Sequence, residues 1–346
     1  MIPPPISLTF ICFIACVSSF VLFPEAFRSP TLEVQPVPQA GELTDETPLP
    51  VVIWHGLGDR FDADGMKDVA KLVDEVNPGT YVHIIRLGDD GDSDRSASFF
   101  GNVTEQVEMV CQQLVSDPIL GTAPAIDALG FSQGGQFLRG YVERCNNPPV
   151  RNLVTFGSQH NGIAAFQNCH AGDFVCRAAD ALLQAGKWSD FVQSRLVPAQ
   201  YFRDPADLDQ YLEHSNYLAD INNERSLKTP KYAENIKSLN KFVMYLFKDD
   251  KTVVPKESSW FAEYNTTSKV VTPLKERPIY KNDWLGLKAL DEKGGLAFDS
   301  VEGEHMQLSK EDLEKAFTAY FGPVKGSSQR SDWRPGRSLD SIQAEL

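Results

Sequence analysis

The chain has 346 residues and a net charge of −14, from 33 lysines and arginines against 47 aspartates and glutamates. With 42% hydrophobic residues it can bury a core and is not disordered as a whole. Phosphate backbones are bound through lysine and arginine, so the acidic balance argues against nucleic acid as a partner. The length predicts one large domain with additions, because α/β folds often reach about 250 residues as one unit.

The N-terminal segment is apolar and uncharged. Residues 6–23 form an almost continuous apolar run, and no charged residue precedes Glu25. This pattern is typical of a secretory signal peptide, predicted over residues 1–26 and followed by a polar linker over 27–49. An uncleaved anchor is the alternative, because the run approaches the minimum bilayer span. Its serines, threonine and cysteines favour cleavage, so no stable membrane span is expected in the mature chain.

The cysteines agree with a secreted protein. Those outside the predicted signal peptide are even in number, which in such a chain indicates disulfide bonds: Cys111, Cys145, Cys169 and Cys176. A metal site built from Cys169, His170 and Cys176 is the alternative, but this spacing matches no zinc pattern, so no metal is expected. Sequons at Asn102 and Asn265 predict glycosylation in the same compartment.

The rest of the chain alternates apolar runs with segments of helical spacing. Strands are expected at residues 50–54, 81–87, 125–129, 151–156, 241–247 and 296–301. Helices are expected at residues 66–76, 103–115, 135–145 and 309–321. This alternation predicts right-handed βαβ units and a mostly parallel sheet.

Two further segments depart from this alternation. Residues 158–239 are largely helical in pattern, and we expect them to form a lid-like insertion that covers one end of the sheet. The folded domain is therefore predicted over residues 50–322. Residues 323–346 are polar and are expected to be a disordered tail.

A G-x-S-x-G motif lies between the third apolar run and the helix that follows it. It places Ser132 between Gly130 and Gly134. Small residues are needed there because the turn that exposes the nucleophile is tight and strained. The helix start also brings N–H groups near a developing oxyanion. Ser132 is the predicted nucleophile of an α/β-hydrolase; a solvated serine in a glycine-rich turn is the alternative.

A serine nucleophile needs a histidine base and a carboxylate that orients it, in the chain order Ser, Asp or Glu, His. His305 lies in a loop after the last predicted strand, where the base is expected. The other histidines after Ser132 are expected to be surface or capping residues: His160, His170 and His214. Asp249 and Asp250 both follow the strand at 241–247, and spacing alone does not choose between them. We favour Asp250, because the acid must clear the strand end.

The oxyanion requires two backbone donors. One is expected at Gln133, which follows the nucleophile, and the other in the loop after the first strand. That loop contains His55, Gly56 and Leu57, and the Leu57 N–H is the predicted donor. A plain glycine turn is the alternative interpretation of this segment.

Several long blocks of the sequence resemble one family, the palmitoyl-protein thioesterases. The blocks are residues 52–59, 130–139, 157–162, 218–222, 258–261 and 302–309. The resemblance extends over about residues 50–321. It implies a soluble lysosomal or vacuolar glycoprotein that hydrolyses the thioester between a fatty acyl chain and cysteine.

Carried over position by position, the resemblance implies Ser132 as nucleophile, Asp250 as acid and His305 as base, with no cofactor. It also implies disulfides that join Cys111 to Cys145 and Cys169 to Cys176. The first would contribute roughly 3 to 4 kcal/mol by closing a loop. The family's adjacent cysteine pair after the His-Gly loop is absent, since Arg60-Phe61-Asp62 stands there, and the C-terminal tail has no counterpart.

The expected activity is hydrolysis of palmitoyl thioesters on protein cysteines, with S-palmitoylated proteins or peptides as partners. The expected location is the secretory pathway, ending in the lysosome, the vacuole or the extracellular space. Two alternatives remain. One is a secreted lipase or carboxylesterase that uses the same three residues on oxygen esters, and the other is a non-catalytic lipid-binding protein with the same fold.

Overall fold

The computed structural model describes residues 47–164, 186–265 and 268–324, all of which belong to the compact unit Leu43–Leu346. Several predictions fall outside these residues: the signal peptide, most of the linker, the tail, His170, and the pair Cys169 and Cys176.

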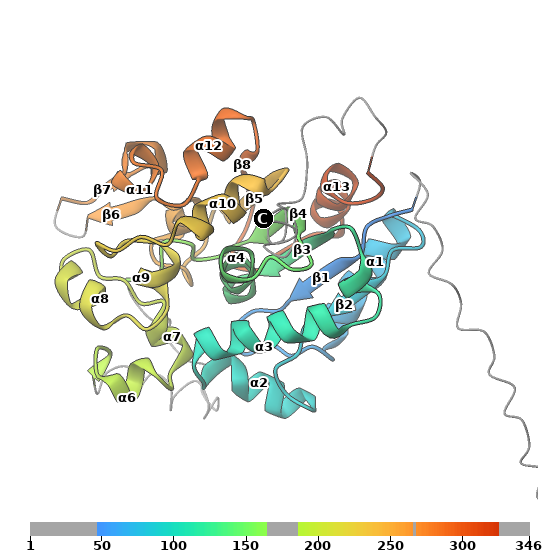
Figure 1. The fold of residues 1–346 in the computed structure, drawn as a ribbon, viewed down its shortest axis with the longest axis horizontal. Helices are drawn as coiled ribbons and strands as arrows, with labels where there is room; N and C mark the ends of the chain where they lie inside the picture. The colour runs from blue at the N-terminus through green and yellow to red at the C-terminus, as the bar shows by residue number, and fades with distance from the viewer. Residues whose placement is uncertain (1–46, 165–185, 266–267, 325–346) are drawn as a thin grey trace, which may run out of the picture. The chain divides into compact units, whose positions relative to one another are not determined.

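The centre of the described chain is a six-stranded sheet, shown in Figure 1. Its strands are β1 (Val51–Trp54), β2 (Val82–Ile84), β3 (Ile126–Phe131), β4 (Val150–Phe156), β5 (Lys241–Phe247) and β8 (Leu296–Val301). Their order across the sheet is β2-β1-β3-β4-β5-β8, and every neighbouring pair is parallel. The predicted parallel sheet is therefore confirmed.

Helices cover both faces of this sheet. Alternate residues of β1 point to opposite faces, so Val52 packs in one core cluster and Val51 in the other. The first cluster includes α3 (Val103–Ser116), α4 (Gln133–Arg144) and α10 (Pro230–Ser238). The second includes α1 (Asp64–Val76) and α13 (Lys310–Tyr320), which pack against each other. Strands buried on both faces explain the continuous apolar runs.

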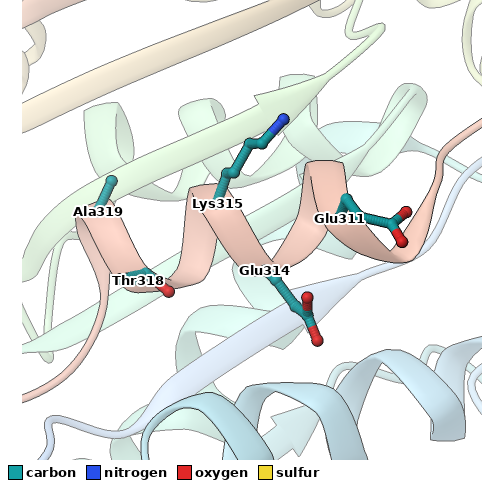
Figure 2. A pocket seen from close by; sticks show the side chains of 5 residues that line it. All are labelled: Glu311, Glu314, Lys315, Thr318 and Ala319. Atoms are coloured by element: carbon teal, nitrogen blue, oxygen red, sulfur yellow. The ribbon is translucent and has the colours of Figure 1, made fainter.

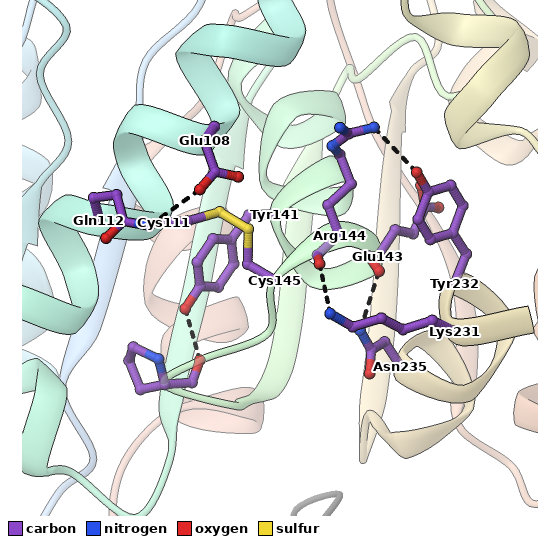
Figure 3. Close-up of a disulfide and its surroundings, with 11 residues drawn as sticks. Glu108, Cys111, Gln112, Tyr141, Glu143, Arg144, Cys145, Lys231, Tyr232 and Asn235 are labelled. Carbon is purple, nitrogen blue, oxygen red and sulfur yellow. Dashed lines mark hydrogen bonds between the residues drawn. A yellow bond between two sulfur atoms is a disulfide. The ribbon is translucent and has the colours of Figure 1, made fainter. Parts of the chain in front are cut away.

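A disulfide joins the two helices on one face. The predicted apolar stripe of α3 is buried as expected: Val103, Val107, Val110, Cys111 and Leu114. Cys111 is bonded to Cys145, the residue that ends α4, with their Cα atoms 6.1 Å apart (Figure 3). The Tyr141 hydroxyl donates to the Pro148 carbonyl, 2.8 Å away, and fixes the chain after the helix. The C-terminal end of α4 is thus tied to α3.

The segment between β4 and β5 is built from short helices in its described part. They are α6 (Asp190–Gln193), α7 (Val197–Gln200), α8 (Leu208–His214), α9 (Leu218–Ile221) and α10. Buried ion pairs lie within this segment and join it to a later one. Arg203 and Arg277 both pair with Glu224. Removal of one partner from such a buried set would leave an uncompensated charge, which is strongly destabilising.

Some elements had no clear sequence signal. The helix α2 (Gly91–Phe99) begins with a capping box between Asp90 and Ser93, yet it buries Asp94 and Ser98 beside only one large apolar side chain, Phe99. The remaining unpredicted elements are short: η1 (Leu120–Thr122), η2 (Lys256–Trp260), β6 (Glu263–Asn265), β7 (Val270–Thr272), η3 (Leu274–Glu276), α11 (Pro278–Lys281) and α12 (Leu287–Glu292). Across the described ranges, no helix has the length and apolar content needed to cross a bilayer.

Candidate active site

Ser132 lies at a sharp turn between β3 and α4. Its φ of 50° and ψ of −122° are a strained conformation for a residue with a side chain. The turn is held by the Ser132 N–H, which donates to the Phe156 carbonyl on β4, 2.8 Å away. The strain thus presents the hydroxyl at the end of the sheet, where only 9% of the residue is exposed.

The glycines around Ser132 are needed for close packing. A Cβ on Gly134 would overlap the carbonyl oxygens of Trp54 and His55 at the end of β1. A Cβ on Gly130 would overlap the backbone of Gly135 in the first turn of α4. The motif therefore contains glycine because strand, turn and helix come within backbone contact.

Ser132, His305 and Asp250 form a hydrogen-bonded series. His305 Nδ1 lies 2.7 Å from Asp250 Oδ2, and His305 Nε2 lies 3.0 Å from Ser132 Oγ. A carboxylate only accepts hydrogen bonds, so Nδ1 carries a proton, and in the neutral ring Nε2 then presents a lone pair to the serine hydroxyl. The arrangement can therefore take a proton from Ser132.

The surroundings hold the two partners of Ser132 in place. The other carboxylate oxygen of Asp250 accepts from the N–H groups of Thr252 and Val253, at 2.8 and 3.0 Å. The His305 ring packs edge-on against Phe247. The Asp250 side chain is 1% exposed and that of His305 is 13% exposed, so only the base is open to solvent.

The neighbouring acid and the other histidines lie elsewhere. Asp249 is exposed, whereas Asp250 turns inward to meet His305. His214 is partly exposed at the end of α8, as expected.

The expectation for His160 was wrong. Its ring is fully buried between Phe242 and Phe261, and its Nε2 lies 3.1 Å from Thr155 Oγ1. Burial, together with the nearby Arg139 charge, lowers the pKa of His160 well below its ordinary value. Apolar packing at this strand end outweighed the polar character of the residue, and His160 is a neutral part of the core.

The loop after β1 approaches Ser132 closely. A Cβ on Gly56 would lie 3.2 Å from the Ser132 Cβ, so Gly56 borders the nucleophile. The backbone N–H of the next residue, Leu57, donates to no protein group within the described chain, and neither does the N–H of Gln133. Both predicted donors are therefore free to bind another acceptor.

A second histidine and carboxylate pair lies beneath this loop. His55 Nε2 lies 2.8 Å from Asp94 Oδ2, and His55 Nδ1 lies 2.9 Å from the Gly56 carbonyl oxygen. Burial alone would lower the pKa of His55, but the hydrogen bond and charge of Asp94 outweigh it and raise that pKa. Burial acts oppositely on Asp94, yet His55 and backbone donors lower its pKa. Each partner therefore favours the charged form of the other, a feature that spacing did not reveal.

Two other surface features contain none of these residues. A hollow on the outer side of α13 is lined by Glu311, Glu314, Lys315, Thr318 and Ala319 (Figure 2). In the described part of the chain, the one cluster with metal-ligand types is Glu108, Cys111 and Cys145, whose sulfurs are joined in the disulfide. Neither feature offers a second reaction centre.

The predicted sequon at Asn102 lies at the start of α3. Asn102 is the N-cap of that helix, and its side-chain oxygen accepts from the N–H groups of Thr104 and Glu105. Asn265 ends β6, next to the undescribed residues of its sequon. The Arg60-Phe61-Asp62 segment contains an ion pair between Arg60 and Asp62 and donates the Phe61 N–H to Asp94.

The chain is similar to known proteins over most of its length. The family model described as palmitoyl protein thioesterase matches residues 50–305. Palmitoyl-protein thioesterase 1 of Caenorhabditis elegans is 41% identical over 76% of this chain and 88% of its own length. Lysosomal thioesterase PPT2 of Rattus norvegicus is 27% identical over 81% of this chain and 87% of its own. A putative hydrolase structure from Agrobacterium vitis covers 80% of this chain and 88% of its own at 13% identity, with a TM-score of 0.43.

A parallel sheet whose third strand in sequence ends in a strained serine, with histidine and aspartate supplied by later strand ends, defines an α/β-hydrolase. The match of the family model over most of the chain, together with the 41% identity, identifies the branch of that class. The chain belongs to the palmitoyl-protein thioesterase family, a family of hydrolases. The expected family and fold class are therefore confirmed.

Proposed function

We propose that the protein hydrolyses long-chain fatty acyl thioesters on protein or peptide cysteines, with Ser132 as nucleophile, His305 as base and Asp250 as orienting acid. The observation that carries this proposal is the 3.0 Å contact between His305 Nε2 and Ser132 Oγ, in a chain of this family. A hydroxyl is a weak nucleophile, and this contact is what activates it.

In the acylation step, Ser132 Oγ attacks the acyl carbonyl carbon while His305 Nε2 takes the hydroxyl proton. The carbonyl oxygen becomes an oxyanion, to which the N–H groups of Leu57 and Gln133 donate. The carbon–sulfur bond then breaks, and the cysteine thiolate leaves and takes the proton from His305. Asp250 holds the Nδ1 proton throughout and stabilises the imidazolium.

In the deacylation step, water attacks the acyl-serine carbonyl while His305 again accepts a proton. The same two N–H groups bind the second oxyanion. The ester bond to Ser132 breaks, Oγ recovers its proton from His305, and the free fatty acid leaves. No cofactor is needed in either step.

The acyl chain is expected to lie in an apolar groove beneath the insertion and across the sheet end. Each buried methylene contributes about 0.8 kcal/mol, so long chains should be preferred up to the length of the groove. S-palmitoylated proteins or peptides are the proposed substrates, in agreement with the family.

The proposed location is the secretory pathway, ending in the lysosome, the vacuole or the extracellular space. The apolar N-terminal run and the Cys111–Cys145 disulfide support it, and so does the rat relative, which is named a lysosomal thioesterase. Glycosylation at Asn102 and Asn265, and a second disulfide between Cys169 and Cys176, belong to the same proposal.

The test compares purified wild-type protein with Ser132→Ala on matched palmitoyl thio- and oxyesters. The variant should lose on the order of a millionfold in kcat, as other serine triads do. Near-wild-type turnover by the variant would overturn the proposal. Faster turnover of the oxyester would assign the protein to the lipases or carboxylesterases. No turnover of either ester and no labelling by a fluorophosphonate would assign it to lipid binding.

A further inference from the structure

Helix α2 contacts both segments that carry the proposed oxyanion donors, the loop after β1 and the start of α4. It contributes the buried side chains Asp94 and Ser98, four residues apart and hence on one face. One face of a short polar helix therefore contacts the loop after β1 and the start of α4.

The Asp94 carboxylate accepts four hydrogen bonds, two from the loop after β1 and two from the loop after β2. Oδ2 accepts from His55 Nε2 and from the Phe61 N–H, each 2.8 Å away. Oδ1 accepts from the N–H groups of Leu87 and Gly88, at 2.6 and 3.4 Å. The carboxylate thus fixes the loop both before and after Leu57.

Ser98 contacts both sides of the proposed oxyanion site. Its Oγ accepts from the Gly58 N–H, 2.8 Å away, and donates to the Arg95 carbonyl at 2.6 Å. Its backbone carbonyl accepts from Gln133 Nε2 at 3.1 Å. Gln133 Oε1 in turn accepts from the Tyr201 hydroxyl of the insertion, at 3.0 Å. One residue therefore links the neighbour of Leu57 to the side chain of Gln133.

We propose that α2 is a positioning element for the hydrolysis, in which Asp94 and Ser98 set the separation of the Leu57 and Gln133 N–H groups. This inference rests on the proposed function of those two groups. Donors stabilise a developing oxyanion most when they are already oriented, and a displacement of about 1 Å can cost a hundredfold in rate. Next to these two donors, the Gly58 N–H and Gln133 Nε2 are both bonded to Ser98 of α2, whereas the N–H groups of Leu57 and Gln133 donate to no protein group within the described chain.

The experiment compares Ser98→Ala and Asp94→Asn with matched controls on the same helix. Ser96→Ala and Asp92→Asn change exposed residues of identical type, each two residues from its counterpart and hence on the opposite side of the helix. Full-length purified proteins are assayed with a palmitoyl-cysteine peptide. We expect kcat to fall roughly tenfold for Ser98→Ala and about a hundredfold for Asp94→Asn, with KM within about twofold and both controls at wild-type rates.

Two inhibitors separate positioning from a merely structural role. A long-chain trifluoromethyl ketone adds to Ser132 and forms an oxyanion, whereas a hexadecyl thioether of the peptide has no carbonyl and measures only binding. The affinity of the ketone should fall in proportion to kcat/KM, while the affinity of the thioether stays unchanged. Equal loss of both affinities would mean a general distortion and would overturn the proposal.

A milder variant covers the case in which Asp94→Asn does not fold. Tyr201→Phe removes only the hydroxyl that bonds Gln133, and it should lower kcat by about threefold with the same inhibitor pattern. If Ser98→Ala and Tyr201→Phe both match Ser96→Ala, the role of α2 is refuted. If instead Ser132→Ala retains activity, the proposed function itself fails, whatever the α2 variants do.

Discussion

Two histidine and carboxylate pairs lie within one site and have opposite properties. The loop after β8 carries His305, which bonds Asp250 on one side and the Ser132 hydroxyl on the other. The loop after β1 carries His55, which bonds Asp94 and the Gly56 carbonyl. The two pairs differ at the ring nitrogen that does not face the carboxylate. In His305 this nitrogen faces a hydroxyl, which can donate a proton, and in His55 it faces a carbonyl, which cannot.

This difference separates the proposed catalytic base from a structural histidine. Both nitrogens of His55 face acceptors, so the charged ring can donate to both, which agrees with the raised pKa of His55. His305 faces one acceptor and one donor, so its Nε2 is free to take a proton. The same two residue types therefore fix a loop in one place and form the proposed proton-transfer pair in the other.

The largest expected effect comes from replacing each histidine with glutamine. His305→Gln should lose on the order of a millionfold in kcat and change the free energy of unfolding by about 1 kcal/mol or less. His55→Gln should lose roughly a hundredfold in kcat but about 3 kcal/mol in stability, because the buried Asp94 charge is left unpaired. For each variant, steady-state kinetics measure the loss in kcat and urea unfolding measures the loss in stability. Equal activity losses would remove the distinction between the pairs.

Replacement of the proposed acid, Asp250, gives the next largest expected effect. Asp250→Asn should lower kcat by about ten thousandfold, because the amide no longer holds the His305 proton on Nδ1. The rate on a palmitoyl thioester measures it, and circular dichroism confirms that the fold is intact. A loss below tenfold would show that Asp250 does not orient the base.

The structural pair gives a pH dependence of stability. The pKa of His55 is raised above 6.5, so its contribution is complete below pH 6.5 and is lost as the pH rises through the folded value. The pKa of Asp94 is lowered from 3.8, so its contribution is complete above 3.8 and is lost at lower pH. The stability difference between wild type and Asp94→Asn should therefore be largest near pH 5. Urea unfolding of both proteins at that pH and above pH 8 tests this. If the stability difference between them is the same at the two pH values, His55 and Asp94 do not form an ion pair.

The smallest effect is expected at the neighbouring acid. Asp249 is exposed and Asp250 is not, although both follow β5. Asp249→Asn should keep kcat within about twofold of wild type, since a solvated loop charge contributes little. A rate loss comparable to that of Asp250→Asn would reverse the assignment of the acid.

Much of the fold could be predicted because it depends on apolar periodicity. The stripe from Val103 to Leu114 predicted α3, and the run before Gly130 predicted β3. Ser132 and His305 could be identified as candidates because the order of the reacting residues along the chain is constrained in this fold. Spacing left Asp249 and Asp250 open, and only the inward turn of the loop places Asp250 against His305.

The rest depends on contacts that no local pattern encodes. The helix α2 has polar residues on its buried side, so an apolar stripe could not reveal it. His55 pairs with Asp94 across a large sequence separation, and its charge follows from that contact alone. His160 has a polar side chain but is buried between two aromatic rings, where tertiary packing decides its place.

The Cys111–Cys145 bridge has a practical consequence for anyone who makes this protein. It anchors one end of α4, and the other end of that helix begins at Gln133, directly after Ser132. A reducing bacterial cytosol would leave both thiols free and release that anchor. Recombinant material should therefore be produced by export to the periplasm or by a secreting eukaryotic host.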